Sequence, residues 1–202
     1  MTATINASTS AGVIVTSDTS GSLAIQSNGT TLLTATSTGL VAGSSIITSA
    51  TAQASTSGTS IDFTGIPSWV KRVTVMLRGV SSNGTSDYLL QVGSGSVTTS
   101  GYLGVVTRFN GATPATGNLT SGYLINGSSG TVASAVYDAV LDVILVSTNN
   151  YLIRGIMGAE ANVYSALGCC QIPLSGALDR VRITTVGGTD AFDAGSINIL
   201  YE

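Results

Sequence analysis

The sequence predicts an all-β protein, in which an antiparallel β-sandwich of jelly-roll type follows a meander of short strands. Three observations support this fold class. The apolar runs favour Val, Ile, Thr and Tyr, the residues that are enriched in sheets. Many of these runs place an apolar residue at every second position, which is the period of a half-buried strand. Long stretches of Leu, Glu, Lys and Ala with helical spacing are absent.

The composition is that of a folded chain that carries little charge. Charged residues make up 8% of the 202 residues, whereas ordinary globular domains have roughly 25%. Hydrophobic residues make up 43%, so the chain does not resemble a charged disordered protein. The length is sufficient for one large domain or two small ones with a real core.

Residues 1–48 form the predicted meander. Asp18 is the only charged residue in the first 60 positions, and there is no aromatic residue among them. Short apolar pieces alternate with the turn sequences at 18–21 and 27–29. One copy of such a segment buries little apolar area against the entropy of ordering its backbone. We therefore expect partners to order it, either intertwined copies of the same chain or a docking surface on a larger assembly, and disorder is the alternative.

Residues 49–60 are a low-complexity stretch of Ser, Thr and Ala. Two interpretations remain open, a linker or an outer strand that opens the next domain, because polar and small residues alternate here. We place the domain boundary near residue 48. Residues 49–202 are then the predicted sandwich domain.

The strongest strand signals of the sandwich begin in the segment 66–92. Apolar residues alternate with polar ones over 70–80, and a second strand is predicted at 88–92. Asn83-Gly84 lies between them and is typical of a hairpin turn. Pro67 predicts where the first strand begins, because a proline has no N–H to donate to the hydrogen-bond ladder of a sheet.

Further strand candidates follow at regular intervals. Asn149-Asn150 between two strong runs predicts a hairpin turn. Eight to ten antiparallel strands in this span favour two packed sheets. The additional candidates are Tyr102–Phe109, Ser121–Ile125, Thr131–Ala135, Ala139–Ser147, Tyr151–Ala159, Val163–Leu167, Arg180–Val186 and Ser196–Tyr201.

Charge and hydropathy argue against two classes of partner. The net charge is −3 and the isoelectric point is near 4.6, whereas nucleic-acid binding usually needs a clustered basic face. Lys71, Arg72 and Arg78 are the densest basic group and are typical of a solvated strand face. No apolar run reaches the ~18 residues of a membrane span, so no membrane insertion is expected. Residues 1–10 show no signal-peptide pattern.

The residue types argue against catalysis. The chain has no His, which excludes the Ser-His-Asp and Cys-His mechanisms. Cys169 and Cys170 are adjacent and are expected to be reduced, largely buried thiols, as in a protein folded in a reducing cytoplasm. Asp190 and Asp193 could supply oxygens to Ca²⁺, but a polar turn before the last strand is favoured. We expect no enzyme, no metal and no cofactor.

Four aromatic residues are the candidates for ligand binding: Trp69, Tyr102, Tyr123 and Tyr151. Such side chains can stack on sugar rings. An exposed cluster of them with polar neighbours would favour glycan binding, whereas their burial would favour a purely structural role.

Three stretches carry a resemblance to a known class of proteins. The stretch IPSWVKRVTVMLRGVSSNGTSDYLLQVGSG, from Ile66, resembles a segment of tailed-bacteriophage structural proteins. The ending GGTDAFDAGSINILYE is similar to their C-termini, and GVIVTSDTSGSLAIQSNGTTLLTAT, near the beginning, resembles the β-repeat leaders of phage tail-fibre and virion-surface proteins. Together the three stretches cover about a third of the chain. The resemblance implies a virion component, usually homotrimeric, with an N-terminal part bound to the particle and an outward β-domain.

The predicted function is therefore structural. We expect a tail fibre or capsid decoration protein that is assembled in the host cytoplasm, with copies of itself and other virion proteins as partners. A module that binds host-surface glycan is the alternative, and both roles can coexist in one fibre. A bacterial surface or secreted β-protein is a third interpretation, which the missing signal-peptide pattern weakens.

Overall fold

The chain divides into two units, Met1–Ile46 and Ile47–Glu202, two residues before the predicted boundary. The roles that we expect for the first unit, attachment and trimerisation, remain predictions. The computed structural model describes residues 23–27, 29–36, 39–42, 47–111, 113–128, 131–133, 135–160 and 164–202.

The first unit contains an antiparallel meander of three strands, in the order β1-β2-β3. They are β1 (Leu23–Ser27), β2 (Thr30–Thr36) and β3 (Gly39–Ala42). Gly29 has φ 76° in the tight connection of β1 to β2, a conformation that glycine adopts without strain. The expected short-strand meander is confirmed here, whereas the apolar piece at 12–16 and the turn at 18–21 lie outside the described residues.

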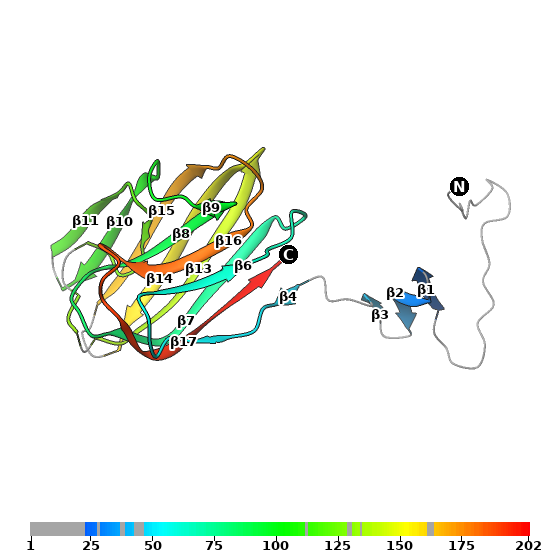
Figure 1. The fold of residues 1–202 in the computed structure, drawn as a ribbon, viewed down its shortest axis with the longest axis horizontal. Helices are drawn as coiled ribbons and strands as arrows, with labels where there is room; N and C mark the ends of the chain where they lie inside the picture. The colour runs from blue at the N-terminus through cyan, green and yellow to red at the C-terminus, as the bar shows by residue number, and fades with distance from the viewer. Residues whose placement is uncertain are drawn as a thin grey trace. The chain divides into compact units, whose positions relative to one another are not determined.

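The second unit is a sandwich of two antiparallel sheets, which confirms the predicted fold class (Figure 1). The large sheet has the order β11-β10-β15-β14-β13-β7-β17-β4, and β5 also pairs with β17. Jelly-roll connectivity in particular remains a prediction. The strands of the large sheet are β4 (Thr48–Ser49), β5 (Gln53–Ala54), β7 (Arg72–Ser82), β10 (Leu103–Asn110), β11 (Thr113–Leu119), β13 (Tyr137–Ser147), β14 (Asn150–Ala159), β15 (Ser165–Pro173) and β17 (Phe192–Tyr201).

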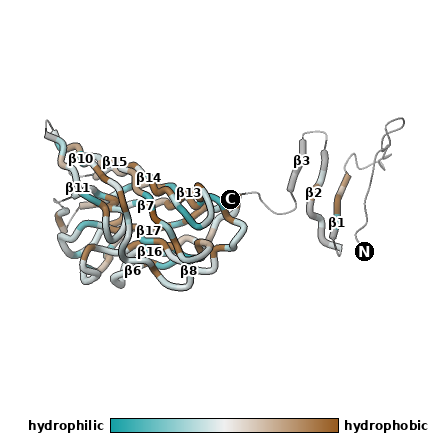
Figure 2. The backbone as a smooth tube through the Cα atoms, turned by 90° about the horizontal axis from the view of Figure 1, so that it is seen from above, coloured by the Kyte–Doolittle hydropathy of each residue, from teal (hydrophilic) through white to brown (hydrophobic). Residues whose placement is uncertain are grey.

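The small sheet has the order β12-β8-β16-β6, and β9 also pairs with β8. Figure 2 shows the two sheets as two layers, with β10, β15, β14 and β13 in one and β6, β16 and β8 in the other. Fully buried side chains from both layers form the core, such as Val75, Tyr137 and Ile153 of the large sheet and Leu90 and Val181 of the small one. The strands are β6 (Ser60–Thr64), β8 (Tyr88–Ser94), β9 (Ser96–Val97), β12 (Tyr123–Leu124) and β16 (Arg180–Thr185).

The hairpin predicted at Asn83-Gly84 is wrong, although both of its strands exist. β7 pairs with β13 and β17, and β8 pairs with β12, β9 and β16. The connection therefore passes from the large sheet to the small one. The loop is held by Asp190, whose carboxylate accepts a hydrogen bond from the backbone of Ser86 at 2.8 Å. A side chain at Gly84 would overlap that carboxylate, so the pattern reflects this close approach and not a hairpin.

Other local predictions differ in detail. The stretch 49–60 holds β4 and β5, which pair with β17, so the outer-strand interpretation is the one the structure shows. The strand expected at 131–135 is absent from its described residues, and a turn closes there with the Ala135 N–H donating to the Val132 carbonyl at 2.9 Å. β11 was not predicted. The β13–β14 hairpin turns at Thr148 and Asn149, one residue earlier than expected, and Asn149 has φ 55°.

Candidate binding site

Three of the four candidate aromatics lie inside the sandwich. Tyr102, Tyr123 and Tyr151 are buried, so the four candidates do not form an exposed cluster. Burial raises the pKa of Tyr102 and of Tyr123, because a phenolate would be poorly solvated there. Their position favours the structural interpretation of these residues.

The hydroxyls of the buried tyrosines are used for structure. Tyr123 donates to the Gly155 carbonyl at 3.0 Å, which ties β12 of the small sheet to β14 of the large one. Tyr151 accepts from the Leu178 N–H at 2.8 Å. Tyr102 also has hydrogen-bond partners, the N–H of Val92 at 2.9 Å and the carbonyl of Thr98 at 3.0 Å. Each buried hydroxyl is therefore satisfied within the fold.

Trp69 is the candidate that remains accessible, with 53% of its surface exposed. It lies in the turn before β7, where the Val70 N–H donates to the Pro67 carbonyl at 3.0 Å. Its ring centroid is 6.0 Å from that of Tyr201, with the ring planes at 52°. A tilted aromatic pair of this kind offers a rigid, partly apolar surface with a polar phenol beside it.

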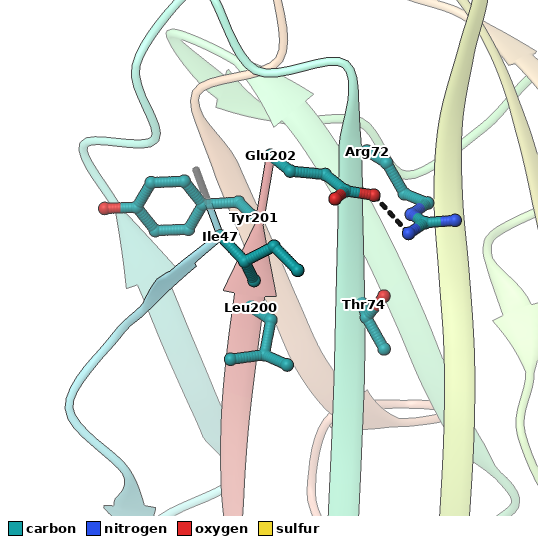
Figure 3. Close-up of a pocket in the computed structure, with 6 residues that line it drawn as sticks. All are labelled: Ile47, Arg72, Thr74, Leu200, Tyr201 and Glu202. Carbon is teal, nitrogen blue, oxygen red and sulfur yellow. Dashed lines mark ion pairs between the residues drawn. The ribbon is translucent and has the colours of Figure 1, made fainter. Parts of the chain in front are cut away.

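The chain next to this pair is held by contacts between the end of β17 and the start of β7. Arg72 and Glu202 exchange two backbone hydrogen bonds of 3.0 Å, and their side chains form an ion pair. In Figure 3 this ion pair lies on one side of β17, with the ring of Tyr201 directed to the other side. The pairing continues the ladder of β7 and β17 and places Tyr201 at a defined position.

Two hollows flank Tyr201. The first, shown in Figure 3, has a volume of about 60 Å³, enough for one or two water molecules. The second is about 260 Å³, close to the lower limit for small-molecule sites. The first is lined by Ile47, Arg72, Thr74, Leu200, Tyr201 and Glu202. The lining of the second includes the polar residues Thr51, Gln53, Asp62 and Thr64.

Among the described residues that line the larger hollow, the single carboxyl side chain is already paired. Asp62 accepts two hydrogen bonds from Arg182, at 2.7 and 2.9 Å, and Gln53 donates to its backbone carbonyl at 2.7 Å. Both oxygens of this carboxylate are therefore occupied by the guanidinium. The arrangement can bind a polar ligand beside aromatic rings, and it does not present an acid–base pair for hydrolysis.

The two acidic residues considered for calcium have separate structural roles. Asp190 accepts from the Ser86 backbone, and Asp193 accepts from the hydroxyl of Ser81. Among the described residues, no group of three or more His, Cys, Asp or Glu is placed to hold a metal ion. The polar-turn interpretation accounts for these contacts.

The two cysteines differ in exposure, which corrects the expectation that both are largely buried. Both are free thiols, and Cys170 is buried whereas Cys169 is exposed. Burial raises the pKa of the Cys170 thiol to about 12. Adjacent residues on a strand point to opposite sides of the sheet, so one thiol enters the core and the other faces outward.

Comparisons with known proteins do not identify a relative. No protein-family model, curated protein or solved structure matches the chain. In the part of the chain that the structure describes, no helix is long and apolar enough to cross a membrane.

Proposed function

We propose that this chain is a structural component of a bacteriophage virion, either a tail fibre or a capsid decoration protein. Its first unit anchors it to the particle, and its sandwich is exposed. The observation that carries the proposal is the uncovered apolar surface of the three-stranded meander. Leu23 and Ile25 in β1 are 44% and 52% exposed. A partner that covers this apolar surface stabilises the meander, because the surface is then removed from water.

The contrast with the second unit supports this division of roles. The sandwich has a continuous core, and its buried tyrosine hydroxyls are bonded within the fold. It therefore accounts for its own stability, whereas the meander depends on neighbours. Copies of the same chain satisfy that need if three meanders pack together as a homotrimer. The resemblance to phage leader sequences supports the same arrangement.

The test is the solution mass of the full-length protein by light scattering on a sizing column. We expect about three times 20.2 kDa, or a multiple of that trimer. Ile25→Asp should lower the mass, because it places a charge on the surface that the copies cover. Thr31→Asp, in the same meander, is the control for added charge. A wild-type monomer would contradict the trimer.

The virion assignment is tested directly by mass spectrometry of purified phage particles from a lysate that encodes this chain. The protein should remain with the particles through a density gradient. Its recovery only in the free-protein fractions would contradict the assignment, whatever the oligomeric state.

A second candidate function, binding of host-surface glycan, is supported by the exposed Trp69 beside Tyr201 and the polar hollow next to them. The chain contains a single Trp, so fluorescence excited selectively at tryptophan reports on this corner alone. A bound saccharide should shift the emission, and Trp69→Ala should abolish binding measured by calorimetry. Leu103→Ala, a change at another exposed apolar residue, should leave binding unchanged. Absence of binding across a broad glycan panel would exclude this function.

A further inference from the structure

The outer face of the large sheet carries a continuous row of exposed apolar side chains. This apolar stripe consists of Val105, Leu167, Ile156 and Val140, which are between 49% and 60% exposed. They come from β10, β15, β14 and β13, four consecutive strands of the sheet. Ile156 lies opposite Val140 on one side and opposite Leu167 on the other, so these three form an unbroken row. Val105 continues it diagonally, because it lies two residues from the position opposite Leu167.

The stripe is large for a surface that faces only water. With Leu103, which is also exposed, it presents roughly 500 Å² of apolar side chain, near the upper end for the largest patch on a monomer. Standard interfaces bury about 800 Å² on each partner, an area that the stripe and its surrounding polar residues can reach together. The area therefore suits a protein partner.

The two charged residues at the centre of this face are paired with each other. Arg154 lies opposite Asp142 and forms an ion pair with it at 3.1 Å. The hydroxyl of Thr74 donates to the same carboxylate at 3.0 Å. A partner needs no opposite net charge to cover such a face, and a second copy brings the same balanced pair. The electrostatics are therefore compatible with the face meeting itself.

The surface of this face has both a ridge and hollows. Val140 and Ile156 form a ridge that separates two hollows of about 350 and 360 Å³. A glycine deepens the second hollow, because a Cβ at Gly158 would meet nothing within 4 Å. One hollow is lined by Val140, Asp142, Arg154, Gly155, Ile156, Leu167 and Gly168. The other is lined by Leu77, Asp138, Ala139, Val140, Ile156, Met157, Gly158 and Ser165.

We propose that this face is an interface between two copies of the chain, related by a twofold axis, with the ridge of each copy seated in a hollow of the other. A twofold interface uses the same patch on both copies, so that patch must carry the projection and the recess together. The stripe meets this requirement. The proposal does not rest on the proposed function, which depends on the meander of the first unit.

Cys169 is a native probe of this interface. It is exposed, and it lies on β15 opposite Val105 on one neighbouring strand and Arg154 on the other. The second thiol, Cys170, is buried and has a raised pKa. In the folded chain a thiol reagent therefore reacts with Cys169 and not with Cys170. In full-length protein, alkylation of Cys169 by iodoacetamide should slow at least tenfold between dilute protein and concentrations at which light scattering shows association.

A matched pair of variants tests the stripe itself. Val140 and Val186 are similarly exposed, at 49% and 44%, but Val186 follows β16 of the small sheet. Val140→Lys should halve the solution mass and restore fast alkylation of Cys169. A lysine there has Asp138 and Asp142 two positions away on the same face, so the fold should tolerate it. Val186→Lys should change neither quantity.

Each result supports or overturns the proposal. Slow, concentration-dependent alkylation in the wild type together with the Val140→Lys effects supports it. Alkylation that is equally fast at all concentrations overturns it, even if the protein is a trimer, since a trimer formed by the meander alone leaves Cys169 open. Equal effects of Val140→Lys and Val186→Lys also overturn it. Protection of Cys169 only in assembled particles would assign the face to another virion protein. Failure of the Ile25→Asp test would leave these results unaffected.

Discussion

The outer faces of the two sheets differ in how they meet their surroundings. On the small sheet, the outward positions of β16 are polar, and Arg182 is joined to Asp62 of the neighbouring strand. The apolar Leu89 of β8 lies outside the main core cluster, yet it is only 4% exposed. On the large sheet, the apolar stripe remains open. Alternation along a strand thus identifies which residues share a face, and it does not decide what covers that face.

The physical difference lies in what the fold supplies to each face. The chain between β11 and β12 lies against Leu89 at the edge of the small sheet, and a Cβ at Gly122 would lie 3.2 Å from the Leu89 side chain. Gln91, two residues further along β8, donates to the Ser121 carbonyl of the same connection at 2.8 Å. The chain itself therefore buries the apolar Leu89 of the small sheet, whereas we propose that a second chain covers the stripe on the large one.

The largest expected effect comes from matched truncations of one leucine on each face. Leu89→Ala should lower the free energy of unfolding by about 2–4 kcal/mol, because it leaves a cavity under the covering connection. Leu167→Ala, at a half-exposed position, should cost less than about 1 kcal/mol. Urea denaturation at a protein concentration low enough to avoid association measures both. Equal losses would remove the distinction between the covered face and the open one.

A smaller loss of stability is expected from Tyr123→Phe. The change removes a hydroxyl that reaches the carbonyls of Gly155 at 3.0 Å and Gly168 at 3.3 Å, beneath the stripe. We expect about 1–2 kcal/mol, the cost of leaving buried acceptors without this donor. Urea denaturation measures the loss. The solution mass should stay unchanged, because the outer face is intact, and a lower mass would mean that association follows general stability.

The ion pair on the small sheet should contribute less. Asp62 and Arg182 are each about one-third exposed, so solvent screens their attraction. A double-mutant cycle with Asp62→Asn and Arg182→Gln should give a coupling free energy below about 1 kcal/mol. A coupling above about 2 kcal/mol would mean that this polar face is a major source of stability.

The smallest effect concerns acid stability at the start of β16. The Arg180 side chain donates to the Asp179 carboxylate and lowers the pKa of Asp179 below its ordinary value of 3.8, and the Gly95 N–H assists. As the pH falls, Asp179 is therefore protonated at a higher pH in the unfolded chain than in the folded one. The stabilisation is present above about pH 4 and is lost as the pH falls through the folded pKa. Arg180→Gln should make the acid loss of stability shallower, as measured by urea midpoints between about pH 2 and 5.

The control for this pH experiment is Arg78→Gln, which removes an exposed guanidinium from the large sheet. It should keep the acid slope of the wild type. A parallel change in both variants would indicate an effect of net charge, and it would contradict the local role of Arg180.

Part of the fold and little of the binding site could be predicted from the sequence. The alternation in β7, β13 and β17 correctly predicted strands, because one face of each is buried against the core. β11, with Pro114 and Gly117, lacked that alternation and was missed. Trp69 was predicted as a candidate. Its neighbour Tyr201 was missed, because the two residues are brought together only by the pairing of β7 and β17.

The sequence by itself determined the fold class, the absence of histidine chemistry and the almost uncharged character of the first 60 residues. These properties follow from residue type and short-range periodicity. Only the tertiary structure decided that β7 pairs with β13 and β17 and not with β8, that Cys169 faces outward, and that Val140 and Ile156 remain open. Strand pairing and coverage depend on contacts between residues far apart in the chain, and local alternation is the same whichever partner a strand finds.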